Sequence, residues 1–374
     1  MADRPSARPI PVKPALAYLL AVGLIGPTAI FKGNNLLVIM LAVVLAMGVL
    51  SVLVSWLGLR RLEVRRMVPQ WGVVGEPLRI RYQVRRRTRW MPSFGLRVAD
   101  DVPLDRVRFD HPAWIMHVGP GEQVHSDARV TPLRRGRVRL RHIEVITSFP
   151  FGLIRRRRRT REDRDLILYP RRHQLRPGVL RASGADRLDG PRSGRKRGAG
   201  REWYGTRPAG ASDSLRDIAW KLSAHRDDLV CLDRAAPSPT RIRVVLDLRR
   251  PTASLQVAEG KDPREEEERS IELAASIIQE LHVAGCDVGL IVAGLLDDAT
   301  PIRSSAWHVH RLMTRLADLD LDQSRTTWNE VDRADRSGAV VIQPGRVRPL
   351  SGVPDALYFT ASQLDHLRVG GDAS

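Results

Sequence analysis

Titratable side chains gather between positions 213 and 228, and they are the residues of this chain best placed for acid–base chemistry. General acid–base catalysis needs two such groups within hydrogen-bond reach of a substrate. A hydrolase that uses Asp213, Asp217 and His225, with Asp227 and Asp228 nearby, is therefore one hypothesis. However, the spacing of Asp213 and Asp217 is that of one exposed helix face. The sequence also contains no Ser-His-Asp elbow, HExxH motif or nucleotide-binding loop, so we predict no enzyme.

The stretch that carries these residues, 201–233, reads REWYGTRPAGASDSLRDIAWKLSAHRDDLVCLD and is called the signature segment below. Apolar residues at Leu215, Ile218 and Leu222, with Trp220 between them, have helical spacing. The sequence thus predicts a helix from Leu215, capped by Ser212 or Asp213. Residues 224–228 are predicted to form a turn, and residues 229–232 a strand. Packing on the flank of a domain would explain this pattern as well as a binding role would.

The signature segment resembles that of a bacterial family known as domain of unknown function 58. That family's pattern continues from a glycine and an arginine into a proline-glycine-aspartate turn and an arginine-isoleucine-aspartate-tryptophan-lysine run. The chain aligns without a gap, and these residues match: Gly205, Arg207, Asp213, Leu215, Arg216, Ile218, Trp220, Lys221, Ser223 and Ala224. It departs from the pattern at four places. Ala209 stands for a tyrosine, Ala211-Ser212 for the proline-glycine pair, Ala219 for an acidic residue and His225 for an arginine.

The resemblance implies a membrane-anchored protein with a von Willebrand A-like domain, whose usual partner is a MoxR-type AAA+ ATPase acting on a client protein. We therefore expect a non-enzymatic scaffold or adaptor with no cofactor. Charged and aromatic residues on one short element are typical of an interface anchor. The expected partner-binding residues are Gly205, Arg207, Asp213, Arg216, Asp217, Trp220, Lys221 and His225.

Von Willebrand A domains commonly bind a divalent cation after their first strand, through an aspartate-x-serine-x-serine run. Hard oxygen ligands at the carboxyl end of a parallel strand suit such a cation. Here the corresponding residues are Asp247, Arg249 and Pro251. Arg249 and Pro251 offer no side-chain oxygen, and Thr252 and Ser254 could replace them only in a rebuilt loop. We expect a degenerate site that binds no metal, with Asp247 retained at the strand end or paired with Arg249.

Composition favours anionic neighbours but not a nucleic-acid site. The formal net charge is +19, which could attract lipid headgroups or nucleic acid. Only five of the 61 basic residues are lysines, however, and such a skew can reflect coding bias. The run Arg155–Arg159 could bind an anionic lipid or nucleic acid, but we favour a solvated strand end, because charged side chains discourage edge-to-edge pairing. No zinc-finger or RNP-like pattern accompanies the run.

Two apolar runs near the N-terminus predict a transmembrane helical hairpin over residues 15–59. The runs are 15–31 and 36–59, and a bilayer-spanning helix needs about 20 apolar residues. Basic residues flank both outer ends, which predicts a cytoplasmic segment 1–14 and a cytoplasmic body after residue 60. The expected location is therefore the inner membrane of a bacterium. Cys231 and Cys286 lie in apolar runs and are expected to be reduced.

Three regions follow the hairpin. Residues 60–170 show period-two alternation, as in 78–84, and predict an immunoglobulin-like β-sandwich. Residues 171–200 are rich in Gly, Arg and Ser and predict a linker. The last region, 201–374, combines the signature segment with alternating strands and helices after Arg241, which predict a mostly parallel α/β sheet.

The hairpin makes a testable prediction about topology. A cysteine placed at Asn34 should react with a membrane-impermeant reagent added outside the cell, and a reporter fused after Ser374 should behave as cytoplasmic. Labelling of a cysteine at position 65 by the same reagent would contradict the hairpin.

Overall fold

The structure is a computed structural model that divides the chain into two compact units, Met1–Arg171 and Arg172–Ser374. It describes residues 9–11, 13–88, 90–101, 105–176, 178, 193–197, 203–210, 213–226, 228–237, 240–257, 260–296, 298–326, 338–350 and 356–369. The boundary between the units lies beside residue 170, where the sequence predicts the end of the β-sheet region.

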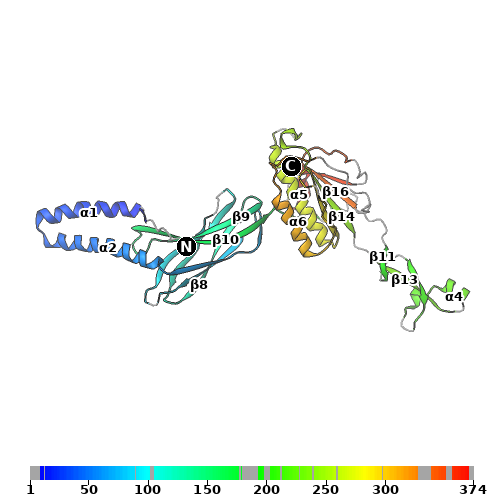
Figure 1. Ribbon diagram of the computed structural model, residues 1–374, viewed down its shortest axis with the longest axis horizontal. Helices are drawn as coiled ribbons and strands as arrows, with labels where there is room; N and C mark the ends of the chain where they lie inside the picture. Colours follow the sequence, from blue (N-terminus) through cyan, green and yellow to red (C-terminus); the bar gives the residue numbers. More distant parts are fainter. Residues whose placement is uncertain are drawn as a thin grey trace. The chain divides into compact units, whose positions relative to one another are not determined.

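Two apolar helices, α1 (Lys13–Lys32) and α2 (Asn35–Leu59), lie side by side in the first unit (Figure 1). Both are long and apolar enough to cross a membrane, in agreement with the sequence prediction. The Tyr18 hydroxyl on α1 donates a hydrogen bond to the carbonyl of Val44 on α2 at 2.8 Å. A Cβ atom at Gly48 would lie 2.2 Å from that hydroxyl, so the absence of a side chain at this position makes the contact possible.

The C-terminal end of α2 is joined closely to the sheets that follow. Arg86 donates hydrogen bonds to the carbonyl oxygens of Gly58 and, at 2.9 Å, Leu57. Ser93 donates to the Gly58 carbonyl at 2.7 Å, and Arg158 donates to the Leu59 carbonyl at 2.7 Å. Carbonyls at a helix C-terminus have no partner within the helix, so side chains of the β region satisfy them.

In the described part of the first unit, strands β2 to β10 follow α2 and form two sheets with β1. One sheet has the order β1-β10-β9-β5-β7, with β3 also paired to β10, and the other has the order β2-β4-β8-β6. The strands are β1 (Pro9–Pro11), β2 (Leu62–Met67), β3 (Trp71–Val73), β4 (Leu78–Arg86), β5 (Ser93–Asp100), β6 (Val107–His111), β7 (Ala113–Val118), β8 (Gln123–Pro132), β9 (Gly136–Thr147) and β10 (Ile154–Tyr169).

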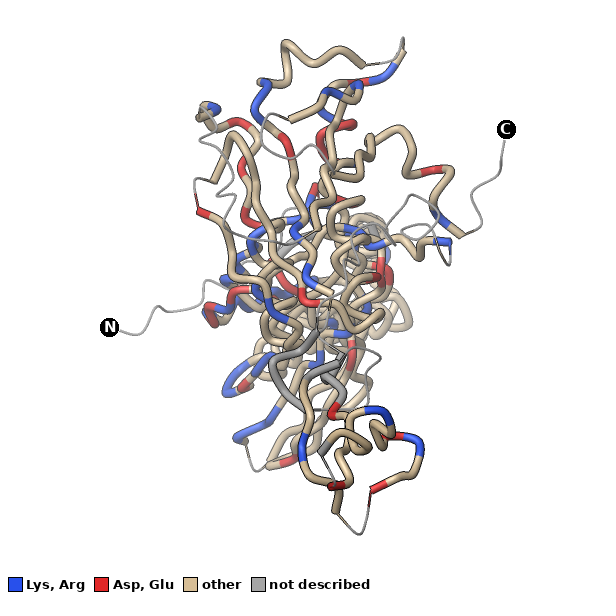
Figure 2. The backbone as a smooth tube through the Cα atoms, turned by 90° about the vertical axis from the view of Figure 1, so that its right-hand side faces the viewer, with Lys and Arg blue, Asp and Glu red and all other residues tan. Residues whose placement is uncertain are grey.

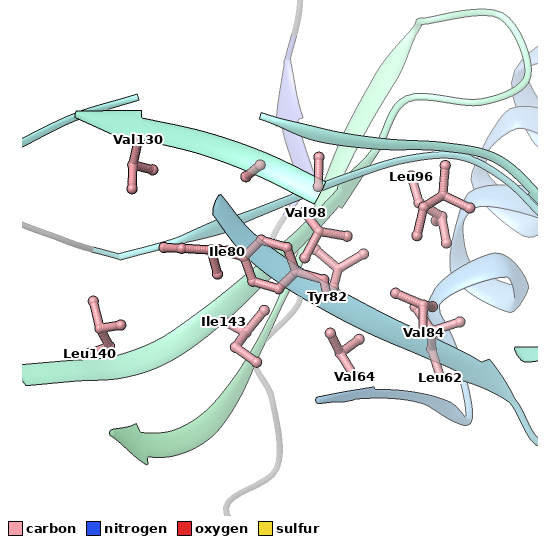
Figure 3. Close-up of a cluster of buried hydrophobic side chains, with 14 of the residues drawn as sticks. Leu62, Val64, Ile80, Tyr82, Val84, Leu96, Val98, Val130, Leu140 and Ile143 are labelled. Carbon is pink, nitrogen blue, oxygen red and sulfur yellow. The ribbon is translucent and has the colours of Figure 1, made fainter. Parts of the chain in front are cut away.

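Both sheets contribute to one hydrophobic core, as Figure 3 shows. Ile80 and Tyr82 come from β4, and Leu140 and Ile143 come from β9 of the other sheet. The alternation of buried and exposed side chains along β4 and β9 therefore confirms the period-two prediction. A buried ion pair between Arg66 and Asp100 crosses this core, and the Tyr82 hydroxyl donates to Asp100 at 2.7 Å.

The basic run Arg155–Arg159 begins at the second residue of the long strand β10 (Ile154–Tyr169), so the prediction of a strand end is confirmed. Only Arg155 and Arg159 are exposed, and the three arginines between them are half-buried, so the run is less solvated than predicted. Strand β9 pairs with the run on one side, and β1 pairs with its first two residues on the other. Arg157 and Arg159 form ion pairs with Glu144, and Arg158 caps α2. These three guanidinium groups already have partners. Figure 2 shows basic and acidic residues interspersed along the described chain.

Strand β1, which precedes α1, pairs with β10, which follows α2 by almost a hundred positions. The backbone register is antiparallel, with Ile10 opposite Arg155. The chain therefore leaves the β sheets through α1 and returns to them through α2.

The second unit contains a four-stranded parallel sheet in the order β15-β14-β16-β17. Its strands are β14 (Arg241–Asp247), β15 (Asp287–Ala293), β16 (Gly338–Gln343) and β17 (Leu357–Thr360). The helices are α5 (Pro263–Val283), α6 (Ala306–Asp318) and the short α7 (Leu364–Leu367), and α5 and α6 pack together against the sheet (Figure 1). The predicted parallel α/β region is confirmed.

Part of the range predicted as a linker is structured. His173 contacts Glu272 of α5 at 3.0 Å, and Leu175 is buried and bridges to Arg368. Strand β11 (Ser193–Arg197) lies further along the same range. Its Gly, Arg and Ser content suggested a linker, but strand pairing with a distant segment decides the local structure here. The rest of 179–200 lies outside the described residues.

Arg86 provides a stability test, with Arg81 of the same strand as its control. Arg86→Met removes the donor that reaches the Leu57 and Gly58 carbonyls and should lower the free energy of unfolding by about 2–3 kcal/mol. Arg81→Met breaks an ion pair with Asp127 that is screened by solvent, and should cost much less than Arg86→Met. Thermal unfolding of the full chain in detergent would measure both, and equal losses would contradict the capping role.

Candidate functional site

The signature segment forms an antiparallel hairpin between β12 (Trp203–Pro208) and β13 (Val230–Pro237). Strand β11 pairs with the other side of β13, giving a three-stranded sheet in the order β11-β13-β12. Arg207 lies opposite Cys231 in the register. Cys231 is a buried free thiol, and burial raises the pKa of that thiol, consistent with a reduced core residue.

Arg207 of β12 connects two acidic residues of the signature segment. Its guanidinium donates to both carboxylate oxygens of Asp213, at 2.6 Å for Oδ2, and to Asp233 of β13 at 3.2 Å. The Asp213 carboxylate also accepts from the backbone N–H of Gly210 at 2.7 Å. The hydrogen bonds with Asp213 raise the pKa of Arg207 above its ordinary value. A bidentate pair of this kind fixes Asp213 against strand β12.

The helix predicted from Leu215 is divided into two pieces, so that prediction was wrong. A 3₁₀ turn, η2 (Leu215–Asp217), is capped by Ser214, and a separate helix, α4 (Trp220–Arg226), follows it. Between them, Ile218 bridges to Cys231 and Ala219 donates its N–H to Val230 at 2.8 Å. This pairing with β13 breaks the helix. Asp213 binds Arg207 and does not cap, while Ser212 lies outside the described residues.

Helix α4 is attached to β13 through Ser223. The Ser223 hydroxyl accepts from the Val230 N–H at 2.9 Å and donates to the Ala219 carbonyl at 3.0 Å. The helix therefore includes positions 224–226, which the sequence assigned to a turn, and the strand begins one residue later than predicted.

Of the apolar residues with helical spacing, Ile218 is buried, whereas Leu215, Trp220 and Leu222 are exposed. Leu215 is 71% exposed, Trp220 is 59% exposed and Leu229 is 53% exposed. Arg216, Lys221, Leu222 and His225 are also exposed. We call these seven residues the exposed face of the signature segment: Leu215, Arg216, Trp220, Lys221, Leu222, His225 and Leu229. Of the remaining expected binding residues, Arg207 and Asp213 are structural, Asp217 is half-buried, and Gly205 lies in β12 with open space around its Cα.

Among the proposed acid–base residues, Asp213 has identified partners and His225 lies at the surface. The Asp213 carboxylate is used by Arg207 and Gly210, and His225 is exposed on α4. Asp227 lies outside the described residues. No cluster of three or more His, Cys, Asp or Glu suited to a metal ion occurs in the part of the chain that the structure describes.

The loop after β14 brings two side chains onto the Asp247 carboxylate. Arg249 donates to Asp247 at 2.8 Å and 3.0 Å, and Gln343 donates to the same carboxylate at 2.9 Å. Burial opposes ionisation of Asp247, but these hydrogen bonds outweigh it and hold the pKa of that carboxyl below its ordinary value. Asp247 thus ends its strand and also pairs with Arg249, which were the two roles considered for it.

The hydroxyls of Thr252 and Ser254, which the sequence offered as alternative oxygen ligands, both have protein partners. Thr252 donates to Glu267 of α5 at 2.8 Å, and Ser254 donates to the Pro251 carbonyl at 3.0 Å. The short 3₁₀ turn η3 (Thr252–Ser254) is therefore tied toward α5.

Sequence reasoning missed the basic pocket beside Asp247. Its volume is 330 Å³, and it is lined by Arg249 and Arg250 after β14 and by Arg346 and Arg348 after β16. The signal was present as two pairs of arginines, each in the loop that follows a buried strand. Recognising it required the knowledge that β14 and β16 are neighbours.

Comparisons with known proteins do not extend this description. No family model and no curated protein matches the sequence. Among solved structures, trypsin-activated alpha-2-macroglobulin from Escherichia coli is similar at 14% identity and a TM-score of 0.22, covering 42% of this chain and 9% of that one. The secreted serine protease VesC from Vibrio cholerae is similar at 10% identity and a TM-score of 0.19, covering 38% and 30%. The chain thus spans less than a third of either protein, and TM-scores this low carry no argument.

The Asp247–Arg249 pair predicts the response to divalent cations. Millimolar Mg²⁺ or Mn²⁺ should leave the melting temperature of the protein unchanged, because a guanidinium occupies the carboxylate and repels a cation. A cation that bound the folded state would stabilise it by mass action. A rise in melting temperature that disappears in Asp247→Ala would contradict this expectation.

Proposed function

We propose that this protein is a non-enzymatic, membrane-anchored scaffold or adaptor of the domain of unknown function 58 family. Its partners would be a MoxR-type AAA+ ATPase and a client protein, in the assembly or activation of that client. The observation that carries the proposal is the exposed face of the signature segment. Leu215 on η2, Trp220 on α4 and Leu229 just before β13 are exposed in a segment that hydrogen bonds of Arg207, Asp213 and Ser223 hold together.

A rigid apolar surface with charged neighbours suits the binding of a protein. Aromatic and basic residues are enriched among the residues that dominate binding energy, and a surface fixed before binding loses little conformational entropy. Arg216 and Lys221 lie among the apolar residues of the exposed face. We therefore expect a partner surface that combines an apolar pocket with acidic side chains.

The architecture supports the family assignment in two further respects. Two mainly antiparallel sheets around one core are the layer arrangement of an immunoglobulin-like sandwich. A parallel sheet covered by helices suits a small von Willebrand A-like domain. The resemblance of the signature segment connects both domains to one family.

The proposed location is the inner membrane, with both helices crossing it and the remaining domains in the cytoplasm. Strand β1 precedes the hairpin and pairs with β10 after it, which supports one side of the membrane for both ends. Basic residues beside these ends, such as Lys13, Arg60 and Arg61, favour the cytoplasmic side.

Binding of lipid or nucleic acid through Arg155–Arg159 is less well supported. Arg157, Arg158 and Arg159 have protein partners, so releasing them would break ion pairs and a helix cap. Binding that weakens steeply with salt would revive this alternative.

Capture of a purified MoxR-type AAA+ ATPase tests the proposal. Trp220→Ala and Lys221→Ala, in the full chain in detergent, should weaken binding roughly 30-fold, because interface anchors contribute about 2 kcal/mol or more. The free energy of unfolding should change by about 0.5 kcal/mol or less, since both residues are exposed. Affinity would be measured by biolayer interferometry, and folding by circular dichroism.

Trp114→Ala is the matched control, because Trp114 on β7 is 60% exposed, about as exposed as Trp220. It should leave binding unchanged. Equal affinity of the Trp220→Ala, Lys221→Ala and unaltered proteins would reduce the signature segment to a structural element.

A further inference from the structure

The pocket beside Asp247 lies at the point of the parallel sheet where the strand order reverses, between β14 and β16. Strand β14 is flanked by β15 on one side and by β16 on the other. The connections that leave β14 and β16 therefore diverge and open a crevice at the carboxyl ends of the two strands, where ligands of parallel α/β sheets bind. The 330 Å³ pocket occupies this position, between the loops that follow Asp247 and Gln343.

The charge of the pocket is strongly positive. Arg249, Arg250, Arg346 and Arg348 line it, whereas Asp247 is the one carboxylate among its described lining residues. Arg249 already neutralises Asp247. Three guanidinium groups are left without a carboxylate partner among the described lining residues.

The remaining arginines have few partners of their own. Arg348 donates to the neutral amide oxygen of Gln256 at 3.2 Å. Arg250 and Arg346 are exposed and form no side-chain hydrogen bond or ion pair with any residue that the structure describes. Like charges repel, so gathering them at one pocket is favourable when an anion lies between them.

Hydrogen bonds of the Gln343 side chain and a close approach of two loops at Gly345 fix the walls of the pocket. Gln343 is buried, donates to both Asp247 and the Arg348 carbonyl, and accepts from the Arg348 N–H at 2.8 Å. A Cβ atom at Gly345 would lie 2.8 Å from the Gln256 carbonyl oxygen, so glycine allows these two loops to meet. The arginines therefore extend from loops that are already in place.

We propose that this pocket binds a phosphate-bearing anion through Arg250, Arg346 and Arg348. Planar guanidinium groups donate paired hydrogen bonds to phosphate oxygens. The described lining contains no aromatic side chain on which a nucleobase could stack, so the recognised group is the phosphate itself. This activity is separate from partner binding by the signature segment and does not depend on it.

Titration with inorganic pyrophosphate tests the proposal, using the full chain in zwitterionic nanodiscs at physiological salt. Calorimetry should show saturable binding, and pyrophosphate should raise the melting temperature. The double variant Arg346→Gln/Arg348→Gln should bind at least about tenfold more weakly, because charge-assisted hydrogen bonds are lost. Arg311→Gln, which removes an exposed arginine of α6 outside the pocket, should bind as the unaltered protein does.

The change in pyrophosphate affinity caused by Asp247→Asn distinguishes an anion site from a metal site, because the two sites predict opposite changes. Removing the carboxylate takes away a repulsion and releases Arg249, so pyrophosphate should bind more tightly. Weaker binding in Asp247→Asn, equal losses in the pocket variant and Arg311→Gln, or no binding at millimolar pyrophosphate would each overturn the proposal.

A second arm distinguishes free phosphate from a lipid headgroup. Nanodiscs that contain phosphatidic acid should weaken pyrophosphate binding by competition if the pocket takes a lipid phosphate. Unchanged binding would assign the pocket to a soluble phosphate compound. Both results presuppose the pyrophosphate site, which the first arm establishes or rejects.

Discussion

The contact between Arg86 and the last carbonyls of α2 is the constraint on which the first unit depends. The carbonyl groups at a helix end need hydrogen-bond partners, and here a buried guanidinium supplies them at Leu57 and Gly58. Ser93 and Arg158 add donors from β5 and β10. Because only two residues separate α2 from β2, the helix end and both sheets form one continuous body. An apolar helix attached in this way cannot rotate independently of the sheets to which it is bonded.

The signature segment shows how one short stretch can divide its residues between two tasks. One group of residues, Arg207, Asp213 and Ser223, forms hydrogen bonds within the segment. The other group, which includes Trp220 and Lys221, is exposed to solvent. Matching a family pattern therefore does not make a residue part of a binding surface. A substitution at Arg207 would disturb the surface by unfolding its support, and a loss of binding in such a variant would not identify a contact.

Features set by local sequence could be predicted, and features set by distant pairing could not. The two apolar helices and the parallel strands follow from runs and periodicity within short windows. The division of the helix at Ile218 could not be foreseen, because it depends on pairing with Cys231 across the hairpin. The basic pocket was missed for the same reason, since its two pairs of arginines meet only when β16 lies beside β14. The exposure of Trp220 also contradicts the helical periodicity around it.

The pairing of β1 with β10 has a consequence for biosynthesis. Ile10 is translated early, but its partner Arg155 leaves the ribosome only after both apolar helices and most of the β strands have been made. Pairings between segments so distant in sequence form late, because the entropy of the intervening chain must be lost before the contacts can form. The hairpin can therefore enter a bilayer while the sheet still lacks this strand. If the hairpin crosses a membrane as proposed, closure by β1 would be one of the last steps of folding, after insertion has fixed the direction of both helices.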